Sequence, residues 1–306
     1  MQTTDRHRPE LLANFWTLAG DHRPGGAPQV SCRNLCARIE AAAQAGFTGI
    51  GFGYTDLVGW TAKIGLQRVA RTLRDHRIRR CEFEFVPGWW DTGSEWDRAA
   101  SAASHLCQII PALGVDSAVV KCVPDRSGMV WPTEVYANGL GRLAQQFSEA
   151  GVRLGLEFVP FSDVSTPARA LDVVTAAGPG IGIVVDAWHV ARGAVPLAEL
   201  TSLPANRIVH AELCDGDRVQ VGDPADDARD RRRLCGEGSF DLPGFVAALR
   251  IAGYRGPFGV EIVSVEQRRR TLVEASTLAY RTALAQFAHA NDAPQITRLE
   301  AGPDGP

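Results

Sequence analysis

The apolar positions along the chain alternate between two periods. Short, mostly aliphatic runs are followed by longer stretches in which apolar residues recur every three or four positions. The first pattern is typical of buried strands and the second of amphipathic helices. The pattern predicts strands at 11–18, 47–54, 80–86, 117–123, 153–159, 182–186, 207–213 and 257–262.

The stretches that follow the strands predict helices, and several have clear end signals. Asp241 is a good N-cap, Pro243 suits a first turn and Gly253 suits the position after the last turn. The predicted helices span 31–46, 64–76, 95–113, 132–151, 167–177, 197–203, 241–253 and 265–289.

Eight alternations of strand and helix predict a parallel sheet, and eight parallel strands can close into a barrel. The alternative is an open doubly wound sheet, but no G-x-G-x-x-G motif follows the first predicted strand. We therefore predict an α/β chain with a single (β/α)8 TIM-barrel domain over residues 1–290. The remaining residues, 291–306, are expected to form a flexible tail.

Composition narrows the classes of partner. The 306 residues carry 32 basic and 35 acidic side chains, a net charge of −3, which does not suit a nucleic acid or an anionic membrane. No apolar run approaches the roughly 18 residues that a membrane span needs. The seven cysteines form no C-x-x-C pair and the first residues are polar, so we expect free thiols and a cytoplasmic location.

Four successive predicted strands finish with an acidic residue, namely Glu157, Asp186, Glu212 and Glu261. The carboxyl ends of barrel strands meet at one mouth, where barrel enzymes have their active sites. Carboxylates buried there need a compensating cation, and oxygen ligands suit hard ions such as Mg²⁺ or Mn²⁺. The pattern therefore predicts a divalent-metal site, although an ion pair with Lys or Arg is the simpler explanation for any one of these residues.

At these positions the chain resembles the sugar phosphate isomerase/epimerase family of xylose isomerase-like TIM barrels, over about residues 10–290. The resemblance rests on Leu-Glu157-Phe-Val-Pro-Phe, Val-Asp186-Ala-Trp-His189, His-Ala-Glu212-Leu-Cys-Asp215, Gly236-Glu-Gly238-Ser-Phe-Asp241 and Gly253-Tyr-Arg-Gly-Pro-Phe-Gly-Val-Glu261. It implies metal binding by Glu157, Asp186 and Glu261 and a substrate contact by His189.

The fourth metal ligand departs from the family pattern. The family usually has histidine or glutamine three residues before an acidic residue, and here Glu212 stands three residues before Asp215. Four carboxylates should favour a hard metal, or leave Glu212 protonated or paired with Arg218. His210, two residues earlier on the same strand face, is the alternative ligand, but we expect it one layer deeper in the barrel.

The resemblance also implies a chemistry. A metal that polarises a substrate carbonyl helps a neighbouring carbon to lose a proton. Glu157 and Glu261 suit the two proton-transfer roles and His189 suits donation to a substrate oxygen, or a structural hydrogen bond to Asp186. On the third strand we expect at most one residue of the Glu82 and Glu84 pair to face the lumen.

Four further residues are candidates for substrate binding. Lys121 ends the fourth predicted strand and suits an anionic or hydroxyl group, although an ordinary ion pair explains it equally well. Trp89 and Trp188 offer flat faces for a sugar ring, although such aromatics often only pack. Arg218 lies in the segment 215–238, whose length and charge suggest a lid or a partner contact.

The leading functional hypothesis is a Mn²⁺- or Mg²⁺-dependent isomerase or epimerase of a keto-sugar or related polyol. The alternative is a lyase that begins with the same deprotonation, either a dehydratase of an inosose or dehydroshikimate-type compound or a C-glycoside- or 3-keto-glycoside-cleaving subunit. Phosphodiester cleavage would need a histidine-rich zinc cluster, which seven histidines hardly supply. A barrel that only binds ligands is the remaining class. The resemblance allows a homo-oligomer or a small partner subunit.

Overall fold

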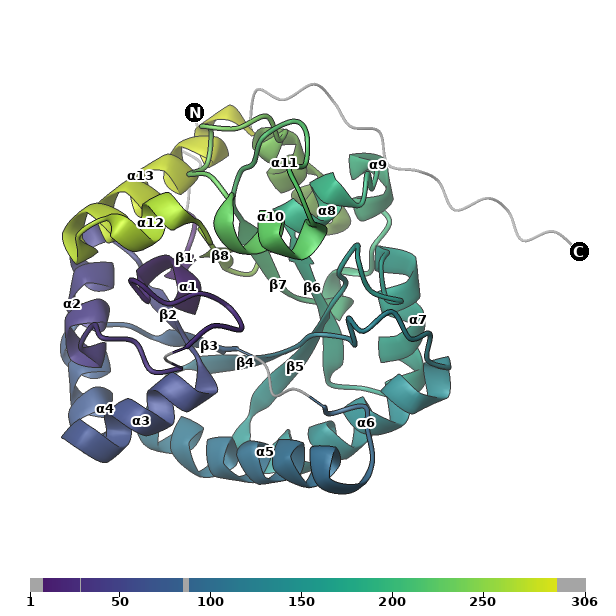
Figure 1. Ribbon diagram of the computed structural model, residues 1–306, viewed down its shortest axis with the longest axis horizontal. Helices are drawn as coiled ribbons and strands as arrows, with labels where there is room; N and C mark the ends of the chain where they lie inside the picture. Colours follow the sequence, from purple (N-terminus) through teal and green to yellow (C-terminus); the bar gives the residue numbers. More distant parts are fainter. Residues whose placement is uncertain (1–7, 28, 85–87, 291–306) are drawn as a thin grey trace, which may run out of the picture.

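Eight parallel strands close into a barrel in the computed structural model, which describes residues 8–27, 29–84 and 88–290. Each strand pairs with the next along the chain, and β8 closes the ring on β1. Helices surround this barrel, as Figure 1 shows. The strands are β1 Leu11–Ala13, β2 Gly49–Phe52, β3 Arg80–Phe83, β4 Ser117–Cys122, β5 Val152–Glu157, β6 Ile181–Asp186, β7 Ile208–Leu213 and β8 Phe258–Val260. The predicted xylose isomerase-like TIM-barrel fold is confirmed.

The outer layer consists of helices that pack apolar faces against the strands. The helices are α1 Phe15–Leu18, α2 Leu35–Ala45, α3 Tyr54–Ile64, α4 Leu66–Asp75, α5 Gly93–Leu113, α6 Thr133–Phe147, α7 Pro167–Ala177, α8 Ala187–Arg192, α9 Leu197–Leu200, α10 Pro224–Asp230, α11 Leu242–Ala252, α12 Val265–Arg269 and α13 Leu272–His289, with 3-10 turns η1 Ser148–Ala150 and η2 Ala205–Arg207. Within the described ranges, none of these helices combines the length and apolarity needed to cross a membrane.

The predicted first strand was wrong in its second half. The run at 11–18 is β1 only as far as Ala13, and Phe15–Leu18 is the short helix α1. A continuous apolar run fits a buried strand and a buried helix equally, so its period could not locate the change. The consequence matters for the site, because Asn14 at the junction turns its side chain into the barrel and donates to Glu212.

The predicted helices omitted one helix and merged two others. A whole helix, α3, precedes the one predicted at 64–76, and Gly65 with φ of 85° separates it from α4. The helix predicted at 265–289 is two helices, α12 and α13, because Thr271 and Glu274 form a capping box that starts a new helix. The predicted tail at 291–306 lies outside the described residues.

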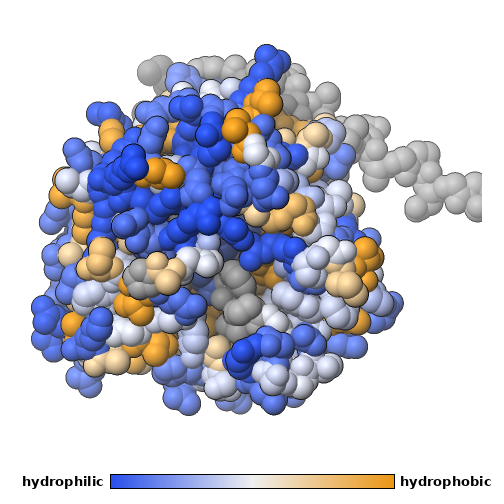
Figure 2. Space-filling model, in the orientation of Figure 1, coloured by the Kyte–Doolittle hydropathy of each residue, from blue (hydrophilic) through white to orange (hydrophobic). Residues whose placement is uncertain are grey.

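The segments after β1 and β7 lie over one end of the barrel. Figure 1 shows α1 and α10 inside the ring of outer helices, near the centre of the view. Residues from both helices line the main cavity. In Figure 2 hydrophilic side chains gather in the upper centre of this face, over the region of α10. The carboxyl ends of the strands therefore open into a polar mouth.

Candidate metal and substrate site

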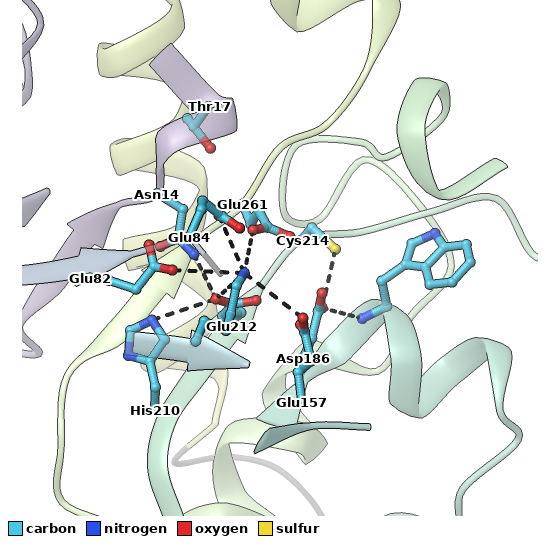
Figure 3. Close-up of polar contacts among 12 residues, drawn as sticks. Asn14, Thr17, Glu82, Glu84, Glu157, Asp186, His210, Glu212, Cys214 and Glu261 are labelled. Carbon is cyan, nitrogen blue, oxygen red and sulfur yellow. Dashed lines mark hydrogen bonds and ion pairs between the residues drawn. The ribbon is translucent and has the colours of Figure 1, made fainter. Parts of the chain in front are cut away.

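The four carboxylates predicted from the strand ends lie together at this mouth (Figure 3). Glu157 ends β5, Asp186 ends β6, Glu212 is in β7 and Glu261 follows β8 directly. Each is at most 4% exposed. The barrel register explains the convergence, because Asp186 pairs with Glu212 on the neighbouring strand.

Two overlapping groups of side chains are close enough to share an ion. Oxygen atoms of Asp186, Glu212 and Glu261 lie within 4.8 Å of one another, and so do ligand atoms of Glu157, Asp186 and His189. The Nε2 atom of His189 is 3.4 Å from Glu157 Oε1 and 3.8 Å from Asp186 Oδ2. The residues that the resemblance implied as metal ligands are thus neighbours in space.

Lys121 lies among these carboxylates. Its Nζ atom is 2.9 Å from Glu261 Oε1, 3.1 Å from Glu212 Oε1 and 4.0 Å from Glu157 Oε2. Burial would lower the pKa of Lys121, but the surrounding carboxylates, Glu157 first, raise it well above its ordinary value. Lys121 is therefore a permanent cation in the barrel, and Glu212 pairs with it rather than with Arg218, the partner considered from the sequence.

The third strand contributes two carboxylates to the lumen, whereas we expected at most one. Lys121 Nζ is 3.4 Å from Glu84 Oε1 and 3.9 Å from Glu82 Oε1. The expectation was wrong because successive side chains of a strand alternate, so residues two apart share a face. Both side chains are buried.

Arg232 is a member of the site that the sequence analysis missed. Its Nη1 atom donates to Asp186 Oδ2 at 2.6 Å and lies 2.9 Å from Glu261 Oε2. In the sequence Arg232 belongs to an arginine-rich run typical of a solvated or substrate-facing loop, and nothing there singles it out from its neighbours. Antiparallel bridges on either side, Asp215 to Arg233 and Arg231 to Ser264, hold this run against the barrel end.

Acidic groups outnumber the cations in this cluster. Among the described residues, Lys121 and Arg232 lie within ion-pair distance of six buried carboxylates: Glu82, Glu84, Glu157, Asp186, Glu212 and Glu261. Glu157 Oε1 and Glu212 Oε2 are buried and have no hydrogen-bond partner among the described residues. Buried carboxylate oxygens without donors are destabilising unless a cation or a proton meets them. The donor set therefore fits a divalent metal ion, which Glu157, Asp186, Glu212 and Glu261 would hold.

The carboxylates divide into two classes by their pKa values. Burial raises the pKa of Glu157 and Glu261, but Lys121 and other cations outweigh it and hold both below the ordinary value. Burial raises the pKa of Glu82 to about 8. Burial and the neighbouring Glu261 raise the pKa of Glu212 well above its usual range. Glu157 and Glu261 are thus ionised at neutral pH, whereas Glu212 takes up a proton more readily than they do when no metal ion is bound.

His210 lies deeper than Glu212, as its place in the strand suggested. Its Nε2 atom is 3.7 Å from Glu212 Oε1, and burial with Lys121 nearby lowers its pKa to about 3. It belongs to neither group of potential ligands. A Cβ atom at Gly259, beside Glu212 in the sheet, would come within 2.7 Å of His210 Nε2, so this layer is tightly packed. The geometry favours Glu212 as the fourth ligand.

A cavity of about 370 Å³ opens above the carboxylates. Glu157, Glu261, His189 and Lys121 line it, as expected of residues that meet a substrate. Trp16 also lines it; we had not singled it out because its segment was predicted as a strand.

The other predicted substrate contacts lie elsewhere. Trp89 is fully buried and its Nε1 atom donates to the Val123 carbonyl, while Trp188 is fully buried beside His189. Neither ring lines the main cavity. Arg218 lines a separate cavity of about 270 Å³ beside α8 and α11. A substrate role for these three residues stays a prediction that the packing does not favour.

His22 is a second cavity residue without a signal in the sequence. Its ring stacks on Trp16 with centroids 5.4 Å apart, and both line the cavity. It is 6% exposed, and its Nδ1 atom has no hydrogen-bond partner in the described part of the chain. Burial lowers the pKa of His22, so the imidazole is neutral. Trp16 and His22 thus form an aromatic pair in the lining of the cavity that the carboxylates also line.

Curated relatives of the chain include enzymes with different reactions. The 3-dehydroshikimate dehydratase of Pseudomonas aeruginosa is 26% identical over 231 residues, which are 74% of this chain and 36% of that protein. The inosose isomerase of Bacillus velezensis is 28% identical over 135 residues, or 43% of this chain and 47% of that protein. The chain thus spans between a third and a half of the length of these relatives.

Solved structures share the fold at lower identity. The zinc-bound IOLI protein superposes with a TM-score of 0.79 and 20% identity, covering 91% of this chain and 98% of its own. A D-allulose 3-epimerase from Methylomonas sp., in complex with D-allulose, gives 0.68 and 19%, covering 92% and 96%. The model of the family described as xylose isomerase-like TIM barrel matches residues 39–283. The chain belongs to the xylose isomerase-like TIM-barrel family.

Proposed function

We propose that the chain is a divalent-metal-dependent enzyme that removes a proton next to the carbonyl of a small sugar-like molecule, and that it isomerises or epimerises this substrate. The observation that supports this most is the pair Glu157 and Glu261. Both line the cavity, both have lowered pKa values and both lie within 4.0 Å of the Lys121 ammonium. Two ionised carboxylates in one cavity are suited to removing a proton and returning it.

The residues around the pair supply the remaining requirements. A divalent ion held by Glu157, Asp186, Glu212 and Glu261 would polarise a substrate carbonyl and offset the negative charge that develops on deprotonation. Lys121 and His189 line the same cavity and are donors for substrate oxygens. Trp16 provides an aromatic face against which a ring or carbon chain can pack.

Within this scheme Glu157 accepts the proton and later releases it to solvent, while Glu261, itself ionised at neutral pH, takes a proton from solvent and passes it to the other face. Glu157 is the better base candidate because Lys121 is 4.0 Å from its Oε2 atom, whereas Lys121 and Arg232 each lie 2.9 Å from an oxygen of Glu261. The Nε2 atom of His189, 3.4 Å from Glu157 Oε1, lies close enough to take this proton on from Glu157.

A dehydratase is the second candidate, because it begins with the same deprotonation and loses a leaving group instead of regaining a proton. The relation to the 3-dehydroshikimate dehydratase favours it, since that match covers 74% of the chain against 43% for the inosose isomerase. The same residues serve both outcomes, and the substrate decides between them. A homo-oligomer or a small partner subunit stays a prediction.

The test uses the full chain, stripped with EDTA and reloaded with Mn²⁺, Mg²⁺ or Zn²⁺. It is incubated in D₂O with D-allulose and other ketoses, an inosose and 3-dehydroshikimate. Isomerisation or epimerisation gives a product with one carbon-bound deuterium and no loss of water. Dehydration gives a product that is lighter by one water molecule, about 18 mass units, and absorbs in the ultraviolet.

Matched variants identify the catalytic groups. Glu157→Gln and Glu261→Gln should each lower kcat by about 10²–10⁴-fold, the usual contribution of a positioned acid or base. Glu134→Gln on α6 changes an exposed carboxylate outside the cavity and should leave kcat unchanged. Wild-type rates in both site variants, or full turnover in EDTA-stripped protein, would contradict the proposal.

A further inference from the structure

Both oxygens of Asp186 and Glu261 already accept hydrogen bonds or ion pairs from the protein. Asp186 Oδ1 accepts from the Trp188 backbone N–H at 2.7 Å, and Asp186 Oδ2 accepts from Arg232. Glu261 Oε1 accepts from Lys121 at 2.9 Å, and its Oε2 atom faces Arg232 at 2.9 Å. These two carboxylates thus differ from Glu157 and Glu212, which each keep one oxygen without a hydrogen bond among the described residues.

The Arg232 side chain is held in this position from several sides. Its Nε atom donates to the Ala228 carbonyl, and its guanidinium lies 5.6 Å from the centroid of the Trp188 ring. Its backbone N–H donates to Val263, next to the end of β8. The side chain is 5% exposed. These contacts hold the guanidinium over the two carboxylates as a built-in part of the site.

An ion that uses oxygens of Asp186 and Glu261 meets this guanidinium at the same atoms. A guanidinium stays charged at every pH at which proteins fold, so it cannot lose a proton to make room. A metal ion must therefore share or replace the hydrogen bonds of the Arg232 guanidinium, and it binds next to that positive charge. Arg232 also lines the main cavity, so a guanidinium displaced from the carboxylates has space on that side.

We propose that Arg232 is an internal competitor for the metal: it neutralises Asp186 and Glu261 when no ion is bound, and a divalent ion has to displace it from them. The inference rests on the proposed metal dependence and concerns how tightly the site takes its ion. If Arg232 acts in this way, the site is already folded before a metal ion binds, and the bound ion exchanges readily. A residue that merely oriented the ligands would do the opposite, because removing such residues typically lowers metal affinity by about 10–100-fold.

The experiment measures Mn²⁺ binding to EDTA-stripped full-length protein by titration calorimetry, without substrate. Arg232→Met, which keeps much of the volume and removes the charge, should bind Mn²⁺ at least about tenfold more tightly than wild type. Arg232→Lys keeps a cation and should stay close to wild type. Equal or weaker binding by Arg232→Met would overturn the proposal, and so would the absence of Mn²⁺ binding in every variant.

Arg192→Met is the matched control. Arg192 is also an arginine packed near the Trp188 ring, at 5.4 Å, but its Nε atom pairs with Asp227 and not with the metal-site carboxylates. Its loss should leave the Mn²⁺ affinity unchanged. A similar gain in Arg192→Met would show that loosening this region, rather than removing a competing charge, tightens binding, and would also refute the proposal.

Thermal unfolding gives an independent readout. In EDTA, Arg232→Met should unfold at a lower temperature than wild type, because Asp186 Oδ2 and Glu261 Oε2 then lose the guanidinium that neutralises them. Saturating Mn²⁺ should raise its Tm more than that of wild type, since an ion that binds only the folded state stabilises it in proportion to affinity. An equal Mn²⁺-induced rise in both proteins counts against Arg232 as competitor. Deuterium incorporation by the same wild-type sample would show that the proposed function stands even so.

Discussion

Glu82 offers a direct test of the electrostatics in the barrel. The side chain is fully buried, and neither carboxylate oxygen has a hydrogen-bond partner among the described residues. Lys121, 3.9 Å away, compensates only part of the burial, and the pKa of Glu82 rises from 4.5 to about 8. The folded protein therefore keeps a proton on Glu82 over a range in which the unfolded chain has lost it.

The sign and size of the effect follow from proton linkage. A raised pKa means that Glu82 contributes its stability fully below pH 4.5 and loses it as the pH rises towards 8. Each pH unit in this range changes the free energy of unfolding by about 1.4 kcal/mol, so the protein loses up to about 4 kcal/mol of stability between pH 5 and pH 8. Glu82→Gln carries no titrating group, so this loss should disappear in the variant.

The assay is urea unfolding in EDTA at pH 5, 6, 7 and 8. The free energy of unfolding of Glu82→Gln, relative to wild type, should rise steadily with pH. Glu134→Gln, an exposed substitution, should show no such trend. A difference between Glu82→Gln and wild type that is the same at every pH would refute the assignment of a raised pKa to Glu82.

Two predictions concern buried contacts next to the site. Gly259→Ala places a Cβ atom 2.2 Å from Asn14 Oδ1 and 2.7 Å from His210 Nε2, so urea unfolding should show a loss of about 1–3 kcal/mol, and wild-type stability would contradict this packing. Arg38→Met leaves Asp56 buried without its ion-pair partner, and the same assay should show a loss of about 3–5 kcal/mol. A conservative Arg38→Lys should recover part of that loss, and no loss in Arg38→Met would count against a buried charge at Asp56.

The convergence of the acidic side chains could be predicted because it depends on strand ends alone. Glu157, Asp186, Glu212 and Glu261 each follow an apolar run, and a parallel barrel brings the carboxyl ends of its strands to one mouth. Lys121 follows the same rule at the end of β4. No contact between these residues had to be known in advance, only the number of strands and their direction.

The surroundings of that set depended on segments whose paths the sequence does not specify. Arg232 reaches Asp186 because antiparallel bridges fold an arginine-rich run back onto the barrel. Asn14 reaches Glu212 because β1 stops early and a helix follows. Trp16 joins the cavity for the same reason. Such contacts join residues far apart in the chain, and no periodic pattern encodes them.

The sequence by itself determined the barrel, its eight strands and the acidic ring at its mouth, because burial of apolar faces and the period of each element are local properties. Only the tertiary structure decided how the charges balance. Lys121 and Arg232 pair with different oxygens of the carboxylates, and Glu157 Oε1 and Glu212 Oε2 are left without hydrogen bonds among the described residues. The nearby cations also keep Glu157 ionised. Charge balance depends on distances between side chains of different strands and loops, and those distances exist only once the chain has folded.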